Sequence, residues 1–492
     1  MHQAMPIQRG HTMQGTSVNI IAQLAKSADY RSNDIAIIDD SGVELTYGEW
    51  WRRAVELAAV LPQIPAGERI LLAFHNAEFL DFATAYMAVM ATGAVATPVA
   101  LPQPRHEINR IIDIVGPRYL LSTKSVDSNV EYHIITELLA NGVKSEWPRK
   151  ALVSHESGSP AQILFSSGTT GTPSAIIVPH GNLGWSVKQN FDAREGTLLH
   201  TLPLGTSAFQ NQLVRTITHD YPVRVLSGFD PARLNAVIST SPDVTSLVFP
   251  PAMVAQLGRS WTSADVHPQI VAVGMTGSFP TPDTHSILQH AFPNAKIFTS
   301  YGSTEASPAG TSGQYDPRRP RNVGRPREGT SLRITDEAGR VVQNGRVGRI
   351  WLSAHNAPTR TYLDPNLNVA SFDQSWVRTS DFGYLAEDGS LELVGRASNI
   401  IAVGGRKVSV EEVEYQLLKH PRVFDVLVEG RNHTTLGQEV CAKVVASDLT
   451  AAELREFARH RLSPYKVPSR IDFVTHLERN SMGKILRRTP LL

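Results

Sequence analysis

Short apolar runs alternate with longer segments of helical pattern along most of the chain. The run at 69–74 predicts a buried strand, residues 77–92 predict a helix, and 94–99 predict the next strand. Such alternation favours parallel sheets covered by helices, which is an α/β architecture. The same pattern predicts further strands at 35–38, 118–122, 198–202, 245–249, 270–273 and 296–299, and further helices at 46–61, 106–115, 209–218, 231–239 and 282–291.

The pattern changes from Ser331 onward. Short apolar runs at 331–335, 348–352 and 391–394 are separated by Asp/Gly turns and predict a β-rich subdomain. From about Gly395 a last unit combines both periodicities and predicts a small α+β lid domain. Its expected elements are helices at 410–418 and 451–462 and strands at 423–428 and 440–445. We therefore expect a large N-terminal domain at 1–395 and a mobile C-terminal lid at 396–492.

A loop rich in glycine and hydroxyl groups lies between two apolar strands predicted at 163–165 and 176–178. Its backbone N–H groups and hydroxyls can point inward together, which suits a polyphosphate. A surface turn has the same composition, but close strands on both sides make that interpretation weaker. The loop is not a Walker A motif, because no Gly-Lys-Ser/Thr follows at the required spacing. Its candidate binding residues are Ser166, Ser167, Gly168, Thr169, Thr170 and Gly171.

This loop resembles the phosphate loop of the adenylate-forming superfamily, which includes acyl- and aryl-CoA ligases, peptide-synthetase adenylation domains and luciferases. The usual form is Ser-Gly-Thr-Thr-Gly-x-Pro-Lys-Gly. Residues 167–173 match this form, but Ser174 stands where the lysine is expected. Further motifs follow in the family's order at 300–305, 379–383, 395–408 and 479–488, and the chain is most similar to bacterial acyl- or aryl-acid ligases.

The resemblance implies roles for five residues of the nucleotide site. Tyr301 would lie beside the adenine, Thr304 would contact the α-phosphate, and Glu305 would be a ligand of Mg2+. Asp381 would accept the ribose hydroxyls, and Arg396 would bind ribose or phosphate. Seen in isolation, a carboxylate at a strand end or turn is more often a solvated or turn-forming residue.

Two parts of the lid match the family as well. Lys484, in a Gly-Lys-Ile-Leu-Arg context, would bridge the substrate carboxylate and the α-phosphate, where charge builds up during attack. The Gly404-Gly405 pair resembles the loop near the path of the thiol, although a hairpin turn explains these glycines equally well. Ser398 occupies the hinge position, which usually carries Asp or Lys, and this weakens the expectation of domain rotation.

The acid-binding residues are expected to be small or apolar. By position these are Phe209, Pro250, Met253, Met275 and Thr276, and they favour an uncharged acyl or aryl acid. The usual aromatic/His gate of the family is absent from the stretch at 203–209. No Asp follows a Phe in that stretch, which argues against an α-amino acid.

Charge and composition exclude several other classes. The chain has 492 residues and a formal net charge of +1, so no overall field favours nucleic acid or membrane. Cys441, the single cysteine, lies in an alternating apolar run and is expected to pack in a core. The N-terminus has no apolar signal-like segment, so we expect a cytoplasmic protein. A local basic cluster at 318–327 is either a solvated loop or a contact for a CoA phosphate or an acidic carrier protein.

The sequence therefore predicts an ATP- and Mg2+-dependent ligase that forms an acyl-adenylate from a small carboxylic acid and then an acyl thioester. CoA is the expected acceptor, and a carrier-protein thiol or an amine remains open, because the adenylation half-reaction is shared. A degenerate, non-catalytic nucleotide binder is the alternative that Ser174 and Ser398 raise.

Overall fold

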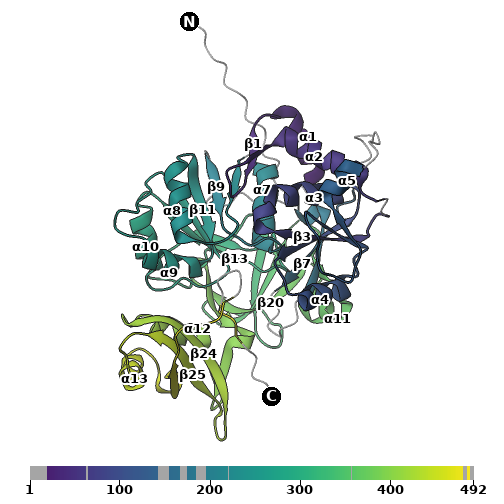
Figure 1. Cartoon of the computed structure of the whole chain (residues 1–492). Coiled ribbons are helices and arrows are strands. Elements are labelled where there is room, and N and C mark those ends of the chain that lie inside the picture. The colour runs from purple at the N-terminus through teal and green to yellow at the C-terminus, as the bar shows by residue number, and fades with distance from the viewer. Residues whose placement is uncertain are drawn as a thin grey trace.

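The computed structural model describes residues 19–62, 65–141, 155–166, 174–183, 196–219, 221–355, 357–479 and 485–487. Within these residues the strands form four sheets, two of them large and mainly parallel. Figure 1 shows the large sheets side by side in the upper part of the molecule, with the C-terminal unit below them. The α/β architecture expected from the alternating pattern is confirmed.

The nine-stranded sheet carries much of the site. Its central strands run parallel, and β14, β15 and β2 pair antiparallel at its ends. In spatial order its strands are β15 (Arg325–Pro326), β14 (Thr311–Gln314), β13 (Lys296–Tyr301), β12 (Ala272–Thr276), β11 (Val244–Phe249), β9 (Thr197–His200), β10 (Val223–Val225), β1 (Ile35–Ile38) and β2 (Glu44–Thr46). Its outer face packs on α8 (Pro231–Thr240), α9 (Pro251–Ser260) and α10 (Thr284–Ala291).

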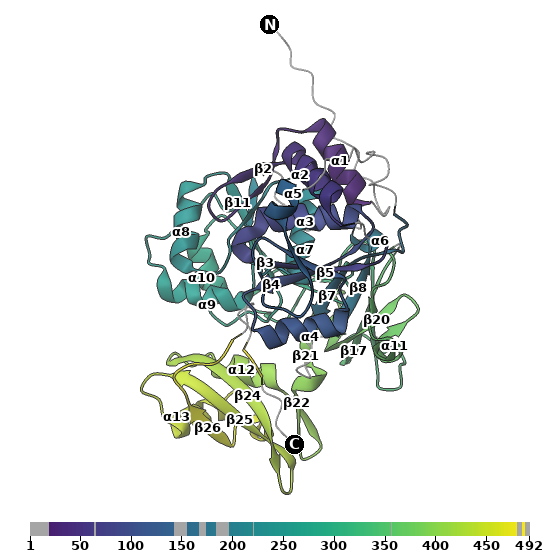
Figure 2. The same cartoon turned by 45° about the vertical axis from the view of Figure 1, so that its right-hand side comes forward.

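The seven-stranded sheet lies beside it (Figure 2). In spatial order its strands are β18 (Thr361–Tyr362), β8 (Ser174–Pro179), β7 (Pro160–Ser166), β4 (Val95–Leu101), β3 (Arg69–His75), β5 (Tyr119–Ser122) and β6 (Tyr132–Ile134). The surrounding helices are α1 (Ile20–Tyr30), α2 (Tyr47–Val60), α3 (Phe79–Ala91), α4 (Arg105–Val115), α5 (Ile135–Asn141) and α6 (His180–Leu183).

One helix, α7 (Ser207–His219), joins the two large sheets (Figure 1). A single core of buried residues contains Leu72 and Leu164 of the seven-stranded sheet, Val248 and Phe298 of the nine-stranded sheet, and Leu213 of α7. Because apolar side chains from both sheets and α7 share this core, the position of one sheet relative to the other is set by packing.

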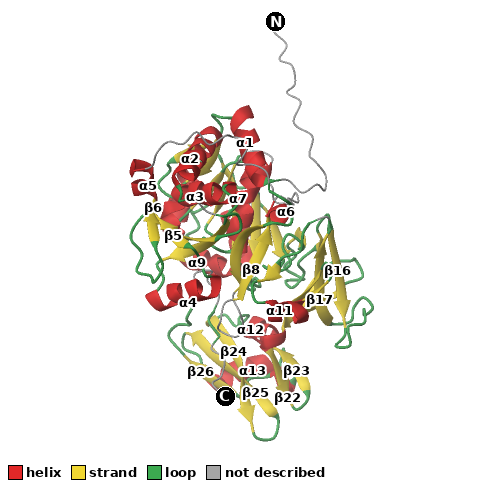
Figure 3. Cartoon of the chain, turned by 90° about the vertical axis from the view of Figure 1, so that its right-hand side faces the viewer, coloured by secondary structure: helices red, strands yellow, loops and turns green. Residues whose placement is uncertain are grey.

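A third, antiparallel sheet forms the predicted β-rich unit. Its strands are β16 (Thr330–Thr335), β17 (Gly348–Ala354), β20 (Trp376–Leu385), β19 (Phe372–Asp373) and β21 (Leu391–Arg396), and the short helix α11 (Pro365–Ser371) precedes β19. Figure 3 shows β16 and β17 standing to one side of β8. Tyr301, at the end of β13, packs into the core of this sheet and so ties it to the nine-stranded sheet.

The C-terminal unit has a core of its own. Its strands are β22 (Ile400–Val403), β23 (Arg406–Ser409), β24 (Val423–His433), β25 (Gly437–Ala446) and β26 (Arg470–Phe473), with helices α12 (Val410–Leu417) and α13 (Ala451–Arg459). Gly404 and Gly405, with φ of 55° and 77°, form the two-residue turn between β22 and β23. Two positive φ values in such a turn require glycine-like residues, so the hairpin explanation of this pair is correct. Cys441 is buried in β25, which confirms the packing expectation.

Helix α9 was not predicted. The stretch from Pro251 has an N-terminal proline that suits the first helical turn. The strand predicted at 270–273 is also displaced, since β12 extends to Thr276.

Candidate active site

Three predicted nucleotide-binding residues meet at one point. Asp381 on β20 lies directly opposite Arg396 on β21, and Arg396 Nε donates to Asp381 Oδ1 at 3.1 Å. The hydroxyl of Tyr301 donates to the other oxygen, Asp381 Oδ2, at 2.9 Å. Burial and the Asp381 charge raise the pKa of Tyr301, so this hydroxyl stays protonated and donating. The arrangement fixes a carboxylate beside a ring and a cation, as binding a ribose and an adenine requires.

A buried arginine holds the loop that follows β13. Arg360 is 2% exposed, and its Nη1 donates to the Thr304 carbonyl oxygen at 2.7 Å. The same guanidinium donates to Asn182 Oδ1 at 2.8 Å and to Ser207 Oγ at 3.3 Å. Burial lowers the pKa of Arg360 to about 10, and the nearby Glu305 carboxylate acts in the opposite direction. Arg360 therefore joins the helix α6, the start of α7 and the Thr304 loop.

Glu305 lies beside the same strand. Tyr362 stands two residues after Arg360, and its hydroxyl donates to Glu305 Oε1 at 3.1 Å. The strand β18 that carries Tyr362 pairs antiparallel with β8, with Tyr362 opposite Ile176. Burial and Glu305 raise the pKa of Tyr362, which keeps it a donor. Arg360 and Tyr362 thus act together on adjacent residues of one loop.

This arrangement fits a magnesium site shared with a nucleotide. The described residues contain no group of three or more His, Cys, Asp and Glu that could hold a metal by itself. A single carboxylate, completed by phosphate oxygens and water, is a usual environment for Mg2+. Glu305 would supply that carboxylate, and Arg360 and Tyr362 would fix its position.

The strands β7 and β8, which flank the candidate phosphate loop in sequence, pair antiparallel. Ser166 ends β7 and is paired with Ser174 at the start of β8. Both are half-buried and uncharged. Ser167, Gly168, Thr169, Thr170 and Gly171 lie outside the described residues.

Lys484 also lies outside the described residues, whereas residues on both sides of it are described. Before it, Arg479 forms an ion pair with Asp425 at 2.5 Å and a β-bridge with Ile485. After it, Arg487 Nη2 donates to both carboxylate oxygens of Glu414 at 2.8 Å. The described parts of the tail are therefore attached to the lid itself.

The five predicted acid-binding residues lie in different places, and Pro250 is the residue directly before α9. Phe209 packs edge-on against Phe79 and Phe82 in the shared core between the large sheets. Met253 on α9 and Met275 on β12 lie in the other core, between the outer helices and the nine-stranded sheet. Thr276 ends β12 and is half-buried. The structure does not bring these side chains together, and their binding role remains a prediction.

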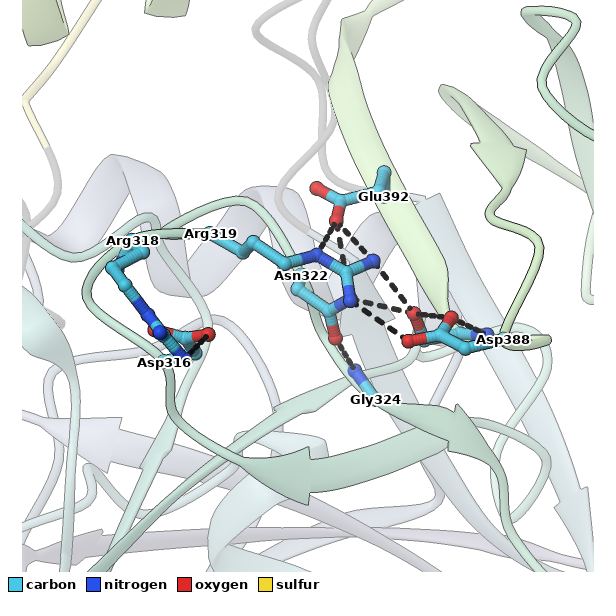
Figure 4. A network of polar contacts seen from close by, with 8 residues as sticks. Asp316, Arg318, Arg319, Asn322, Gly324, Asp388 and Glu392 are labelled. Carbon is cyan, nitrogen blue, oxygen red and sulfur yellow. Dashed lines mark hydrogen bonds and ion pairs between the residues drawn. The ribbon is translucent and has the colours of Figure 1, made fainter.

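Two arginines of the basic cluster at 318–327 form ion pairs within the chain. Figure 4 shows Arg319 between two acidic residues: its Nε donates to Glu392 Oε1 at 2.9 Å and its Nη1 to Asp388 Oδ2 at 2.8 Å. Arg318 pairs with Asp316 at 3.0 Å. The Arg319 contacts connect the 316–324 loop to the β20–β21 hairpin. The charges of Arg318 and Arg319 are therefore paired with acidic residues of the same chain.

Sequence reasoning missed Arg360 and Tyr362. The signal that pointed to them was weak: an arginine and a tyrosine two residues apart, which would share one face of a strand. Nothing in the apolar pattern marks β18, because it is two residues long.

No helix in the described part of the chain has both the length and the apolar character to cross a membrane.

Comparison with known proteins agrees with this geometry. The model of the family "AMP-binding enzyme" matches residues 24–363, and that of its C-terminal domain matches 412–484. The 2-succinylbenzoate–CoA ligase of Geobacillus kaustophilus is 32% identical over 341 residues, which are 67% of this chain and 68% of that protein. The peroxisomal OPC-8:0-CoA ligase 1 of Arabidopsis thaliana is 26% identical over 92% of this chain and 89% of its own.

Solved structures share the whole fold. The o-succinylbenzoate CoA synthetase of Bacillus subtilis, in complex with its acyl-adenylate intermediate, superposes with a TM-score of 0.83 at 23% identity, over 94% of this chain and 96% of that chain. ATP-bound MatB from Rhodopseudomonas palustris gives 0.81 at 24% identity, over 95% and 97%. With a family model that matches most of its length, this chain belongs to the AMP-binding enzyme family.

Proposed function

We propose that this protein is an ATP- and Mg2+-dependent acid–CoA ligase of the AMP-forming type. The observation that carries the proposal is the convergence of Tyr301, Asp381 and Arg396 at the end of the strand whose loop presents Thr304 and Glu305. The relatives named above are CoA ligases, which supports CoA as the acceptor.

In the first step a carboxylate oxygen of the acid attacks the α-phosphorus of ATP, and pyrophosphate leaves. Asp381 holds the ribose and Tyr301 lies beside the adenine, while Thr304 contacts the α-phosphate. Glu305 would hold Mg2+, and the ion would supply positive charge that offsets the charge of the phosphates. Lys484 would stabilise the charge that develops between carboxylate and phosphorus.

In the second step a thiolate attacks the acyl carbonyl carbon, and AMP leaves with its electron pair. We propose that residues 1–395 form the adenylation domain and 396–492 the lid that carries Lys484 and the Gly404–Gly405 turn. The five-stranded sheet of the lid begins at β22, which follows Arg396 after the short 3-10 helix Ala397–Asn399, and this supports the boundary. Because ATP and CoA are cytoplasmic metabolites, we propose a cytoplasmic location.

A carrier-protein thiol or an amine is the second candidate acceptor, since the adenylation chemistry does not depend on the acceptor. Arg318 and Arg319 are already paired with acidic residues of this chain, which argues against these two residues as a contact for an acidic carrier protein. A non-catalytic nucleotide binder is a third candidate function, because Ser174 stands where the family has a lysine and the positive charge is absent there.

Acid-dependent exchange of labelled pyrophosphate into ATP tests the first step. AMP release with and without CoA, measured with the best acid, tests the second. We expect exchange with at least one acid and CoA-dependent AMP release. Tight ATP binding without exchange for any acid would contradict catalysis, and exchange without CoA-dependent release would favour another acceptor.

A further inference from the structure

The tail that carries Lys484 is attached to the lid by polar contacts rather than through the lid core. The buried apolar cluster of the lid ends at Ile471, and none of the described residues after it is buried. The tail is closed instead by the β-bridge between Arg479 and Ile485. Residues 480–484 are therefore a short segment between two bridged positions, and Lys484 is its last residue.

The first attachment of the tail is a carboxylate enclosed between a helix and a strand. Glu414, on α12, has a side chain that is 13% exposed, and both of its oxygens accept from Arg487 Nη2 at 2.8 Å. Arg487 Nη1 donates to the Val428 carbonyl oxygen at 2.8 Å, and the Val428 N–H donates to Glu414 Oε1 at 2.8 Å. A carboxylate, a guanidinium and the backbone of β24 thus form one closed set of hydrogen bonds.

Both attachments are made to the same edge strand. Among the described strands, β24 pairs only with β25, so its other edge offers backbone groups that no strand satisfies. The second attachment is the ion pair between Arg479 and Asp425, three residues before Val428 on β24. Three residues of a strand span about 10 Å, so the two contacts hold the tail at two separate points of one edge.

The contact between Glu414 and Arg487 is of a strong kind. Arginine donors that meet both oxygens of a carboxylate combine charge with a fixed geometry. Burial raises the pKa of Glu414 to about 7, and the charge of Arg487 is the largest effect that opposes this rise. Without Arg487 the carboxyl group would be protonated at neutral pH, so removing the arginine also removes the anion.

The role proposed for Lys484 depends on such support. A group that stabilises developing charge must lie within hydrogen-bond distance of that charge, and a shift of about 1 Å can cost roughly 100-fold in rate. Lys484 stands five residues after Arg479 and three before Arg487. Fixing both arginines on β24 therefore restricts where the lysine can be.

We propose that Glu414 and Arg487, supported by the pair of Asp425 and Arg479, position Lys484 for adenylate formation. The inference rests on the proposed function and deepens it, because these four residues act through Lys484 and not on the substrate. In the proposed mechanism the thiol step does not use Lys484. Loss of the contact should therefore slow the first half-reaction and spare the second.

The test measures the two half-reactions separately in the full-length protein. Adenylate formation is followed by pyrophosphate exchange with the best acid, and the thiol step by AMP release when CoA is added to the synthetic acyl-adenylate of that acid. We expect Arg487→Met to lower kcat of exchange by roughly 10-fold or more, while ATP binding and the thiol step change by less than about 2-fold. Arg487→Lys should recover part of the exchange, since it keeps the charge without the planar pair of donors.

Two comparisons separate positioning from stability. Lys466→Met is the matched control, because Lys466 Nζ donates to both oxygens of Glu412 on the same helix at 2.7 and 2.8 Å, and its loss should leave the ratio of the two half-reaction rates unchanged. The double variant with Lys484→Ala and Arg487→Met should exchange within about 3-fold of Lys484→Ala alone, since a positioning residue has no effect without the group it positions. If Arg487→Met does not fold, Glu414→Gln, which keeps the shape and loses the charge, is measured in the same way.

Equal slowing of both half-reactions by Arg487→Met, or an additive loss in the double variant, would show that the contact only stabilises the lid, and would overturn the inference while leaving the ligase intact. Unchanged exchange in both Arg487→Met and Glu414→Gln would overturn it as well. Exchange with none of the acids, in wild-type protein that binds ATP, would contradict the ligase activity and the inference together.

Discussion

Replacing Arg360 by Met should weaken the response to magnesium more than it weakens ATP binding. The guanidinium donates to the carbonyl oxygen of Thr304, the residue before Glu305, and to Asn182 Oδ1. Without it, the buried Asn182 Oδ1 and the part-buried Thr304 carbonyl oxygen lose this donor. Glu305 then keeps its contact with Tyr362, but its backbone loses the restraint that Arg360 supplies.

The magnitude follows from these contacts. A buried acceptor left without a donor costs about 1–3 kcal/mol, so two of them cost about 2–6 kcal/mol. Removing a buried guanidinium returns part of its desolvation penalty, which leaves a net loss of about 2–3 kcal/mol. If the loop relaxes to escape this cost, the Mg2+ concentration for half-maximal exchange should rise by roughly 30-fold or more.

The assay is pyrophosphate exchange as a function of free Mg2+ at fixed ATP, together with ATP binding and thermal melting. Arg360→Lys keeps one charged donor and should recover part of the Mg2+ response. Arg318→Met is the matched control, because its ion pair with Asp316 is exposed and such pairs contribute about 0–1 kcal/mol. A lowered melting temperature with an unchanged Mg2+ response would show that Arg360 only stabilises the fold, and would refute the positioning argument.

Four further predictions concern other parts of the chain. Ser174→Lys should tighten ATP binding by roughly 3–10-fold if a phosphate-loop charge is missing, and unchanged affinity by calorimetry would show that other groups compensate. Lys484→Ala should slow adenylate formation by roughly 100-fold or more and leave ATP binding intact, and a wild-type exchange rate would eliminate this role. Asp381→Asn should weaken binding of ATP more than of 2′,3′-dideoxy-ATP, and equal losses would argue against a ribose contact. Burial lowers the pKa of His200 from 6.5 to about 3, so its stabilising contribution is present above pH 6.5 and is lost as the pH falls toward 3. Between pH 6 and 4 His200 should therefore reduce the free energy of unfolding by about 1.4 kcal/mol per pH unit, and His200→Gln should remove that slope in denaturant titrations.

The fold was predictable where the apolar period is regular. Strands such as β3 and β11 are continuous apolar runs, and parallel strands buried on both faces produce this pattern. The residues near the nucleotide site could also be predicted from the sequence, because Tyr301 and Glu305 closely follow a predicted strand. The pairing of Asp381 with Arg396 needed the register of β20 and β21, which the sequence does not state.

The positions of the acid-binding candidates were harder to predict, because they too depend on how the strands and helices pack. Met275 and Thr276 are neighbours on β12, so their side chains point to opposite faces of the sheet. Which face meets α7 and which meets α9 depends on the topology, and the sequence alone did not assign Met275 to the outer core.

The strand β18 has a consequence for how distant mutations act. It pairs with the edge of the seven-stranded sheet, yet Arg360 and Tyr362 contact the loop that follows a strand of the nine-stranded sheet. The distance between the two sheets is fixed by the shared core, to which Leu213 of α7 belongs. A cavity made there, for example by Leu213→Ala, would allow the sheets to settle closer together. We expect such a variant to remain folded while Glu305 moves away from its contacts. Substitutions far from the nucleotide would then first change the Mg2+ concentration that gives half-maximal exchange.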